Sequence, residues 1–419
     1  MNGISKNIIY SFIFLIVLFN QVQSRILIVQ KGFRITSIKS ALELSNNGDT
    51  ILVKRDYYSE GTIIVNKSVT LIGENFPIID GNHKNQIMIV KSSNFKITGF
   101  QFQNSGISFI SDNSAIRLDS VNNCIIENNK FLNNFFAIYL SKTRNSQIIN
   151  NTIIASNNKQ TMSGNGIHLW NCKNIYVIGN KIEGHRDGIY LEFVRSSFIE
   201  NNYCKGNLRY GLHFMFSDSC FYRRNHFEMN KAGVAVMFTK NVTMIENNFK
   251  NNWGSSSYGL LLKDITDSKI IRNKFYKNSC GIYFESCNRN QIFNNDFIEN
   301  GWAIKLMTNS MNNLFQRNNF IENTFDVSTN STQNFNTFTE NFWSNYNGYD
   351  LNKDNIGDVP FRPVKLFSFI VANNPVTLIL LRSYFVEILD FAEKIIPTLT
   401  PANLLDEKPL MKRSYDKIN

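Results

Sequence analysis

Hydrophobic and polar residues alternate in short runs along most of this chain. In stretches such as Gly188-Ile-Tyr-Leu-Glu192 and Ser268-Lys-Ile-Ile271, branched apolar side chains recur at alternate positions. A period of two places one face of a β-strand in a core and the other face outside it. Polar corners bound each run, so the pattern predicts a protein made mainly of short β-strands.

The strands recur at a nearly constant interval. An Asn-x-Phe-like unit marks each repeat and ends as Glu340-Asn-Phe342, with steps of 22, 29, 22, 23, 22, 26, 22, 23 and 22 residues between neighbours. The units begin at Asn129, Asn151, Asn180, Asn202, Asn225, Asn247, Asn273, Asn295 and Asn318. The two longer steps contain polar insertions, at residues 156–164 and 254–257, which we expect to be loops.

A second column of asparagines follows each Phe position by three residues. Its members are Asn134, Asn207, Asn230, Asn252, Asn278, Asn300, Asn323 and Asn345. Asparagine tolerates left-handed backbone geometry, and its amide can bond to the same amide one repeat above. Two Asn columns at fixed offsets therefore predict two recurrent corners that are stabilised by stacked asparagines.

Short strands, recurrent corners and a constant period predict an all-β fold, a right-handed parallel β-helix in which each coil stacks on the next. We expect this solenoid to span residues 25–345. Leucine-rich repeats are the alternative fold, but their Leu-x-x-Leu-x-Leu consensus is absent. Residues 36–45 have an N-cap candidate and helical apolar spacing, which predict an N-terminal capping helix.

The repeat stops after Trp343. We expect an Asp/Asn-rich loop at residues 346–363 and a C-terminal helical segment at residues 364–419, with one helix from Pro375 to Ile396. The apolar stripe of that helix includes Leu378, Leu381 and Phe385 and needs a partner. It either contacts another protein or caps the C-terminal end of the coil stack, where strand edges are unpaired.

The N-terminus has the pattern of an export signal. Lys6 precedes the apolar run Ile8–Phe19, and a polar stretch with small residues follows up to Ser24. The apolar run is short for a membrane-spanning helix, although an uncleaved anchor is the alternative. We therefore expect a signal peptide at residues 1–24 and an exported protein.

The charge distribution and the cysteine spacing exclude two classes of function. The 419 residues carry a formal net charge of +11, but Lys and Arg are spread along the chain without a nucleic-acid-binding motif, so we expect no nucleic-acid partner. The six cysteines show no CxxC or paired spacing. We expect them to be small buried hydrophobes and not a zinc or redox site.

The most unusual residues lie within residues 186–264, on the outward face of strands that begin with glycine. Aligning successive coils makes Met215 and Met237 vertical neighbours, about 4.8 Å apart in strand spacing, with His213 beside Met215 on the same strand. Thioether and imidazole groups suit Cu(I), so these three residues are candidate copper ligands. The alternative is an apolar patch that a partner or the C-terminal segment covers.

A second polar group consists of His185, Arg186 and Asp187 with Glu192 nearby. Paired carboxylates on a β-helix face can serve carbohydrate lyase or hydrolase chemistry. Asp187 lies at a corner, however, and Glu192 lies near the far end of the strand. A structural Arg–Asp pair is therefore the favoured interpretation.

A third polar group follows the repeats. Asp350, Asn352, Asp354 and Asp358 place oxygen atoms at alternate positions of a tight loop, as in calcium sites. The glutamate expected at the twelfth position is absent, because Phe361 stands there. The group is therefore a candidate calcium site or a cluster of Asx turns.

Several segments together carry a family resemblance. They are Arg186-Asp-Gly-Ile-Tyr-Leu-Glu-Phe193, Gly211-Leu-His-Phe-Met-Phe-Ser217, Ala232-Gly-Val-Ala-Val-Met-Phe238, Tyr258-Gly-Leu-Leu-Leu-Lys-Asp264, Gly357-Asp-Val-Pro-Phe-Arg-Pro363, Asn374-Pro-Val-Thr-Leu-Ile-Leu-Leu-Arg382 and Pro409-Leu-Met411. With the export signal and the coil stack, the chain resembles the NosD family, periplasmic maturation factors of nitrous oxide reductase. The resemblance covers nearly the whole mature chain.

The resemblance implies a periplasmic, non-enzymatic protein that helps to assemble the copper–sulfur centre of the reductase. Its implied partners are nitrous oxide reductase, a copper chaperone lipoprotein, and the ATPase and permease of an ABC transporter, through which the protein associates with the membrane. The copper ligands named above come from strand register and not from the family. The residues expected on an interaction surface are Trp170, Arg186, Asp187, Tyr190, Glu192, Lys263, Asp264, Leu378, Leu381 and Phe385.

Two other functions fit a β-helix. A carbohydrate-active enzyme, either a polysaccharide lyase or an epimerase, requires an extended acidic groove, whereas the outward columns here mix Lys, Arg, Met and aromatic residues. The other function is that of a passive adhesin or cell-surface solenoid. Such a protein does not need the specific helical tail, so the tail argues against this interpretation.

Overall fold

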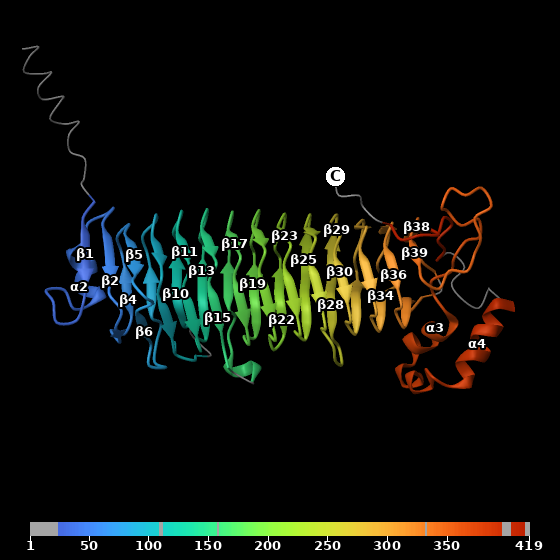
Figure 1. The fold of residues 1–419 in the computed structure, drawn as a ribbon, viewed down its shortest axis with the longest axis horizontal. Helices are drawn as coiled ribbons and strands as arrows, with labels where there is room; N and C mark the ends of the chain where they lie inside the picture. Colours follow the sequence, from blue (N-terminus) through green and yellow to red (C-terminus); the bar gives the residue numbers. More distant parts are fainter. Residues whose placement is uncertain (1–23, 109–111, 157–158, 332, 396–403, 415–419) are drawn as a thin grey trace, which may run out of the picture.

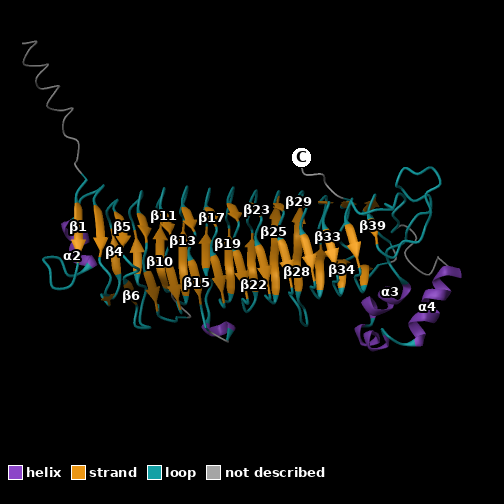
Figure 2. Ribbon diagram, viewed as in Figure 1, coloured by secondary structure: helices purple, strands orange, loops and turns teal. Residues whose placement is uncertain are grey.

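The computed structural model describes residues 24–108, 112–156, 159–331, 333–395 and 404–414. Within these ranges the chain is a parallel β-solenoid of the right-handed type, and its elongated stack of coils runs from the N-terminal end to helices at the other end (Figures 1 and 2). The predicted signal peptide at residues 1–24 lies outside the described residues except for Ser24. The prediction of a parallel solenoid is confirmed.

Three parallel sheets run the length of the solenoid, and each complete coil contributes one strand to each sheet. The first sheet has 14 strands. They are β1 (Ile26–Val29), β2 (Thr50–Val53), β5 (Thr70–Gly73), β8 (Lys96–Thr98), β11 (Ile125–Glu127), β14 (Gln147–Ile149), β17 (Tyr176–Ile178), β20 (Phe198–Glu200), β23 (Phe221–Arg223), β26 (Thr243–Ile245), β29 (Lys269–Ile271), β32 (Gln291–Phe293), β35 (Leu314–Gln316) and β38 (Thr337–Thr339).

The second sheet has 13 strands, which follow those of the first sheet around each coil. They are β3 (Tyr57–Tyr58), β6 (Ile78–Asp80), β9 (Gln101–Gln103), β12 (Lys130–Leu132), β15 (Thr152–Ile154), β18 (Lys181–Glu183), β21 (Tyr203–Lys205), β24 (His226–Glu228), β27 (Asn248–Lys250), β30 (Lys274–Tyr276), β33 (Asp296–Ile298), β36 (Asn319–Ile321) and β39 (Phe342–Trp343).

The third sheet has 12 strands, several of them longer than those of the other two sheets. They are β4 (Ile63–Val65), β7 (Met88–Val90), β10 (Ser114–Asp119), β13 (Phe136–Ser141), β16 (Ile167–Trp170), β19 (Asp187–Glu192), β22 (Tyr210–Met215), β25 (Ala232–Lys240), β28 (Tyr258–Thr266), β31 (Cys280–Glu285), β34 (Trp302–Leu306) and β37 (Phe325–Thr329).

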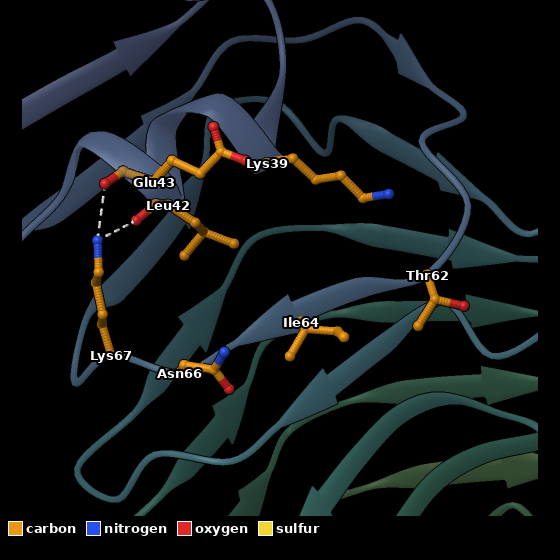
Figure 3. A pocket seen from close by; sticks show the side chains of 7 residues that line it. All are labelled: Lys39, Leu42, Glu43, Thr62, Ile64, Asn66 and Lys67. Atoms are coloured by element: carbon orange, nitrogen blue, oxygen red, sulfur yellow. Dashed lines mark hydrogen bonds between the residues drawn. The ribbon is translucent and has the colours of Figure 1, made fainter.

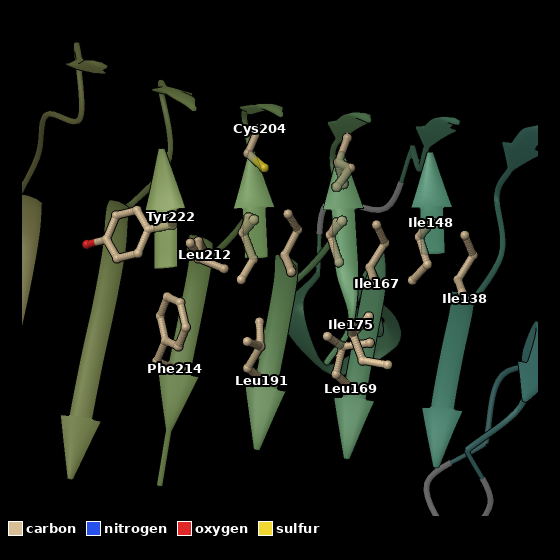
Figure 4. Packing of buried hydrophobic residues seen from close by; sticks show 14 of the residues in the cluster. Ile138, Ile148, Ile167, Leu169, Ile175, Leu191, Cys204, Leu212, Phe214 and Tyr222 are labelled. Carbon is tan, nitrogen blue, oxygen red and sulfur yellow. The ribbon is translucent and has the colours of Figure 1, made fainter. Parts of the chain in front are cut away.

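The inward faces of the three sheets form one continuous hydrophobic core. Figure 4 shows how side chains such as Ile148, Leu191 and Phe214 point into the space between the sheets. Phe249 and Phe275 stack with ring centroids 4.6 Å apart, one coil above the other. The cysteines are free and buried, as predicted, and burial raises the pKa of the Cys172 thiol to about 12. Identical positions in successive coils therefore pack as columns.

Stacked asparagines hold the corner between the first and second sheets. The backbone N–H and Nδ2 of Asn247 both donate to Oδ1 of Asn273 in the next coil, at 2.9 and 3.0 Å. Asn247 Oδ1 in turn accepts from the backbone and the amide of Asn225, each at 3.0 Å. The predicted ladder is thus confirmed, and it satisfies buried corner groups that no solvent reaches.

One detail of the corner differs from the expectation. The left-handed backbone does not fall on the ladder asparagines but on the residue before each of them, such as Asn150 (φ 51°) and Glu246 (φ 56°). The ladder asparagine points its amide along the stack, whereas the preceding residue makes the turn and points outward. This division of roles explains why Glu and Arg also occur at the turning position, as at Glu246 and Arg272.

The N-terminal end carries helix α2 (Ile38–Leu44), as the spacing predicted. The Ser37 side chain accepts from the backbone of Ser40, and Ile38, Ala41 and Leu42 are buried. Figure 3 shows the helix beside β4, with Lys67 donating to the carbonyls of Leu42 and Glu43 at 2.7 and 2.8 Å. The lysine thereby satisfies carbonyls at the C-terminal end of the helix. That α2 caps the stack stays a prediction.

The C-terminal segment is less regular than predicted. The single helix expected from Pro375 to Ile396 is wrong within the described residues, because two elements stand there, the 3₁₀ helix η2 (Pro375–Leu380) and helix α4 (Tyr384–Ile395). The Ser383 backbone and hydroxyl both donate to the carbonyl of Leu380, at 2.8 and 2.7 Å, which tightens the turn between η2 and α4. Helix α3 (Leu366–Asn373) precedes them. A further 3₁₀ turn, η1 (Gln160–Met162), lies in the first insertion.

The C-terminal residues close the end of the stack in two ways. Phe367 and Val371 of α3 pack on Phe325 of β37. The last ladder asparagine, Asn341, donates through its backbone and its amide to Oδ2 of Asp406, each at 3.0 Å. Asp406 therefore takes the place of the next asparagine. None of the helices in the described ranges is long and apolar enough to cross a membrane.

Removing one ladder amide should destabilise the fold more than removing an outward amide beside it. The Asn247→Ala variant loses the side-chain bonds to Asn225, Asn273 and the Tyr222 carbonyl, and each buried group left unsatisfied costs about 1–3 kcal/mol. The Asn248→Ala variant removes an amide on the outward side of β27 whose Oδ1 has no hydrogen-bond partner among the residues that the structure describes. Thermal unfolding followed by circular dichroism should show a clearly lower midpoint for Asn247→Ala, and equal midpoints would contradict a stabilising ladder.

Candidate functional site

The candidate residues lie on the outward face of the third sheet, in the middle of the solenoid where β19, β22, β25 and β28 stand side by side (Figure 1). The register is as predicted from the sequence. Tyr190 pairs with His213, and Glu192 pairs with Met215. Met215 pairs in turn with Met237 of β25. The structure thus brings His213, Met215 and Met237 onto one face of two adjacent strands.

Aromatic rings and imidazoles alternate along this face. The ring centroids of Tyr139, His168, Tyr190 and His213 follow one another at 4.7, 4.7 and 4.8 Å, one ring per coil. The Arg117 guanidinium lies over the ring of Tyr139, 4.9 Å from its centroid. Mutual packing covers much of this column, and His213 is only 5% exposed. The face is therefore more deeply buried than a solvated strand face.

Asp187 is the centre of a buried charged group. It begins β19, and its side chain is fully buried although it lies outside the core. Arg209 of the next coil clamps the carboxylate with two hydrogen bonds, from Nε at 2.8 Å and from Nη2. His213 Nδ1 lies 3.5 Å from Asp187 Oδ2 and 3.4 Å from Arg209 Nη2. The expected structural Arg–Asp pair is present, but its arginine is Arg209 and not Arg186.

The pKa values follow from this burial and pairing. Burial acts to raise the pKa of Asp187, but the hydrogen bonds from Arg209 and His213 outweigh it, so the pKa lies below its ordinary value of 3.8. Burial, with the nearby Arg186 charge, lowers the pKa of His168 to about 3. The cluster therefore holds an ionised carboxylate and a neutral His168 at neutral pH.

Arg209 is the functional residue that sequence reasoning missed. Asp187 pairs in register with Tyr210, so Arg209 stands at the corner directly before the position opposite Asp187. The signal was available, because an acidic residue and a basic residue 22 positions apart face one another in a repeat of that length. A search for partners of Asp187 within its own coil does not find Arg209, because the arginine lies one coil away.

Two features around the methionines bear on copper binding. The Tyr190 hydroxyl donates to Sδ of Met215 at 3.6 Å, which places that thioether beside the imidazole column. Nε2 of His213 is buried and has no hydrogen-bond partner among the described residues. The imidazole nitrogen and the two half-buried thioethers lie on the same face of adjacent strands, and donors of these types suit Cu(I). No group of three His, Cys, Asp or Glu side chains in the described ranges is arranged to hold a metal ion.

The other residues expected on the interaction surface separate into two regions. Trp170, Arg186, Glu192, Lys263 and Asp264 are half-buried and lie on the third sheet or at its corners. Lys263 pairs with Glu285 of the next coil, with Nζ and Oε1 3.1 Å apart. Leu378 and Phe385 are 37% and 45% exposed, and Leu381 packs partly on the α3 cluster at the end of the solenoid.

The candidate calcium residues form a network of Asx-type hydrogen bonds. Asp350 accepts from the backbone N–H of Asp354 and Asn355, and Asp354 accepts from that of Ile356. Asp358 Oδ2 accepts from the Leu351 backbone at 2.7 Å. These bonds order the loop with several acidic oxygens already occupied. Calcium binding by Asp350, Asn352, Asp354 and Asp358 stays a prediction.

Comparison with known proteins gives a family match and a common fold. A family model described as "Periplasmic copper-binding protein (NosD)" matches residues 155–348. Two curated relatives are each named "Probable ABC transporter binding protein NosD". The one from Stutzerimonas stutzeri is 24% identical over 379 residues, covering 86% of each chain. The one from Pseudomonas aeruginosa is 25% identical over 371 residues, covering 84% of this chain and 86% of that protein.

Solved structures with similar coils show the fold alone, because their sequences are distant. The catalytic unit of a GH87 alpha-1,3-glucanase from Streptomyces thermodiastaticus has a TM-score of 0.59 and 12% identity, covering 73% of this chain and 65% of that chain. A family 28 exopolygalacturonase from Yersinia enterocolitica has a TM-score of 0.57 and 11% identity, covering 75% and 78%.

Breaking the buried pair should destabilise the protein and reverse its pH dependence. In the natural chain the lowered pKa of Asp187 contributes stability that is present above the ordinary value of 3.8 and is lost as the pH falls. The Arg209→Met variant leaves a buried carboxylate unpaired, at a cost of about 3–5 kcal/mol. Burial then raises the pKa of Asp187, so the variant should lose stability as the pH rises through the acidic range.

Urea unfolding at several pH values measures both effects. The control is Arg224→Met, because Arg224 forms an exposed pair with Glu246 at 2.8 Å, and such pairs contribute about 0–1 kcal/mol. Similar losses in the two variants would show that the Asp187 pair has no special structural role.

Proposed function

Because this chain belongs to the NosD family, we propose that it is an accessory protein of nitrous oxide reductase maturation that helps to assemble the copper–sulfur centre of the enzyme. The observation that carries the proposal is the alignment with two NosD proteins over more than four-fifths of each chain. The description of the family as periplasmic and copper-binding supports a periplasmic location and copper as the cargo. The proposed partners are the reductase, a copper chaperone lipoprotein and an ABC transporter.

We assign the contact with the transporter to the C-terminal helices. Val376 and Ile379 of η2 are 79% and 87% exposed, and Tyr384 and Phe391 of α4 are 75% and 65% exposed. Apolar side chains this exposed on neighbouring helices are typical of a surface that another protein covers. The naming of both relatives as probable ABC transporter binding proteins supports the permease as that protein.

We assign copper to His213, Met215 and Met237. Met215 and Met237 are both half-buried on the outward face, and Asp187 beside Nδ1 of His213 can fix the orientation of the imidazole and leave Nε2 for a ligand. Bound copper would be transient cargo, because thioethers are neutral ligands and release Cu(I) readily to thiolate or sulfide.

The burial of Asp187 weighs against a polysaccharide lyase or epimerase. A catalytic carboxylate must reach its substrate, whereas Asp187 is fully buried and clamped by Arg209. Glu192 lies farther along the same strand, and on this face Lys263 and the two methionines follow it in the next coils. The arrangement therefore favours a binding protein over a carbohydrate-active enzyme.

Charges placed on the exposed apolar helices should release the protein from the transporter. We expect an Ile379→Glu/Phe391→Glu double variant to fold normally, because both side chains are exposed, but to lose co-purification with the permease and ATPase from detergent-solubilised membranes. Cells with this variant should make reductase that lacks the catalytic copper centre.

Phe33→Glu is the matched control, because Phe33 is also 65% exposed but lies at the N-terminal end of the solenoid. Transporter recovery that is equally low in the control, or unchanged in the double variant, would contradict docking through the C-terminal helices.

Removing both thioethers should weaken Cu(I) binding. Loss of outer-shell groups alone lowers metal affinity about 10–100-fold in proteins, so a Met215→Ala/Met237→Ala variant should lose at least that much in a Cu(I) competition titration. Met311→Ala is the control, because Met311 is 39% exposed in another part of the chain. Equal Cu(I) affinity in the double variant and the natural protein would remove these residues as ligands.

A further inference from the structure

The corner that follows the third sheet requires a left-handed residue in each of eight successive coils. Five coils supply residues that are small or polar, namely Ser120, Lys142, Asn171, Asp264 and Ser286, with φ between 51° and 57°. The three coils in between supply phenylalanine: Phe193, Phe216 and Phe238, with φ of 54°, 50° and 54°. A bulky aromatic residue in this conformation is unfavourable, and Asn or Asp is the residue type that the geometry prefers.

The three phenylalanines gain nothing from the core in return. They are 48%, 41% and 40% exposed, respectively. Their rings stack on one another across the coils, with centroids 5.2 Å apart between Phe193 and Phe216 and 5.1 Å apart between Phe216 and Phe238. An exposed row of aromatic rings in an unfavourable backbone conformation indicates a role in binding, because functional sites are where such conformations persist.

A row of positive charges runs beside the phenylalanines. Arg144, Lys173 and Arg195 stand in register in successive coils, joined by parallel backbone bridges. All three are exposed, and they do not take part in the ion pairs formed within the described part of the chain. Asp218 follows Arg195 in this row, and its Oδ1 accepts from the backbone of Lys240. The row therefore has unpaired cations at one end and an acidic residue at the other.

Phe193 and Phe216 share one cleft with the three cations, and Phe238 continues the aromatic row by stacking on Phe216. The volume of the cleft is about 460 Å³, and its lining includes Trp170, Phe193, Phe216 and the three basic residues. The Lys142 ammonium lies 5.6 Å from the centroid of the Trp170 ring. Aromatic residues and arginine are enriched in protein–protein interfaces, and unpaired cations at the edge attract acidic side chains.

We propose that Phe193, Phe216 and Phe238, with Arg144, Lys173 and Arg195, form a docking site for a protein partner whose surface presents acidic side chains beside apolar ones. Phe216 and Phe238 directly follow Met215 and Met237 in the chain. A partner seated here lies beside the proposed copper ligands, so the site extends the proposed function with a contact separate from the C-terminal helices. The inference of a docking site rests on the proposed function only where it assigns a role to the partner.

The apolar character of the aromatic row favours a protein over an acidic polysaccharide, because the cations alone would attract either one. Phenylalanine rings have no hydrogen-bonding group, whereas a sugar site needs polar groups that pair with hydroxyls. The aromatic row instead offers apolar surface of the kind that protein interfaces bury, and the cations stand at its rim. Binding of a uronate polymer is the competing outcome in the test.

The test replaces all three rings by the residue that the corner prefers. A Phe193→Asn/Phe216→Asn/Phe238→Asn variant should unfold at the same temperature as the natural protein or a higher one, because asparagine tolerates left-handed geometry. Photo-crosslinking in cells, with a benzophenone amino acid at position 216 of the full chain, should capture a protein at a segment that contains Asp or Glu. The purified partner should then bind the triple variant at least about tenfold more weakly.

Two further variants make the result specific. An Arg144→Gln/Lys173→Gln/Arg195→Gln variant should weaken the same complex and reduce its salt dependence. A Tyr176→Thr/Phe198→Thr variant removes another stacked aromatic pair, with centroids 5.0 Å apart on the first sheet, and should bind normally.

Three results would overturn the proposal: a crosslink to lipid or to a segment without acidic residues, unchanged partner affinity in the triple variant, or polygalacturonate binding that depends on the three phenylalanines. Co-purification with the transporter should persist in the triple variant. Failure of the docking site is thereby separated from failure of the proposed function.

Discussion

The stacking of identical corner groups is the constraint on which the rest of the structure depends. Each coil must place its buried amide where the next coil can receive it, as Asn225, Asn247 and Asn273 do through bonds of 2.9–3.0 Å. This requirement fixes the register of all three sheets, since a shift by one residue would turn core side chains outward. Because the register is fixed, every outward residue acquires a defined neighbour one coil above and below. Outward side chains at equivalent positions of successive coils therefore form columns on the surface of this protein.

The periodic sequence made the fold predictable but concealed parts of the site. The interval between asparagines predicted the stack and placed Met215 opposite Met237, as the strands show. Arg209 was missed because its partner, Asp187, lies one coil away and only a comparison across coils reveals the pair. The break between η2 and α4 was missed because the apolar stripe continues through it, whereas Ser383 bonds back to Leu380. Periodicity predicts what repeats, and the missed features are local departures from it.

Departures from the repeat are also where the proposed functional sites are concentrated. A buried carboxylate outside the core, an imidazole nitrogen without a partner and phenylalanine at a left-handed corner each cost stability that a simple solenoid would avoid. All three occur on or beside β19, β22 and β25. Residues that serve only the fold, such as the ladder asparagines, recur in nearly every coil. The contrast identifies this part of the third sheet as a region whose residues meet a constraint other than the stability of the fold.

The solenoid also fixes the separation between its two proposed contact surfaces. Four strand spacings lie between β25, which carries Met237, and β37, on which α3 packs, and at about 4.8 Å per spacing this amounts to roughly 19 Å. The continuous core and the asparagine ladders make this spacer stiff, since neighbouring coils cannot slide without breaking buried hydrogen bonds. A partner on the phenylalanine row and a transporter on the C-terminal helices would therefore be held at a set distance. Movement of the proposed cargo between them would require motion of the partners, because the ladder of buried amides runs unbroken from Asn247 to Asn341 through the coils that separate the two surfaces.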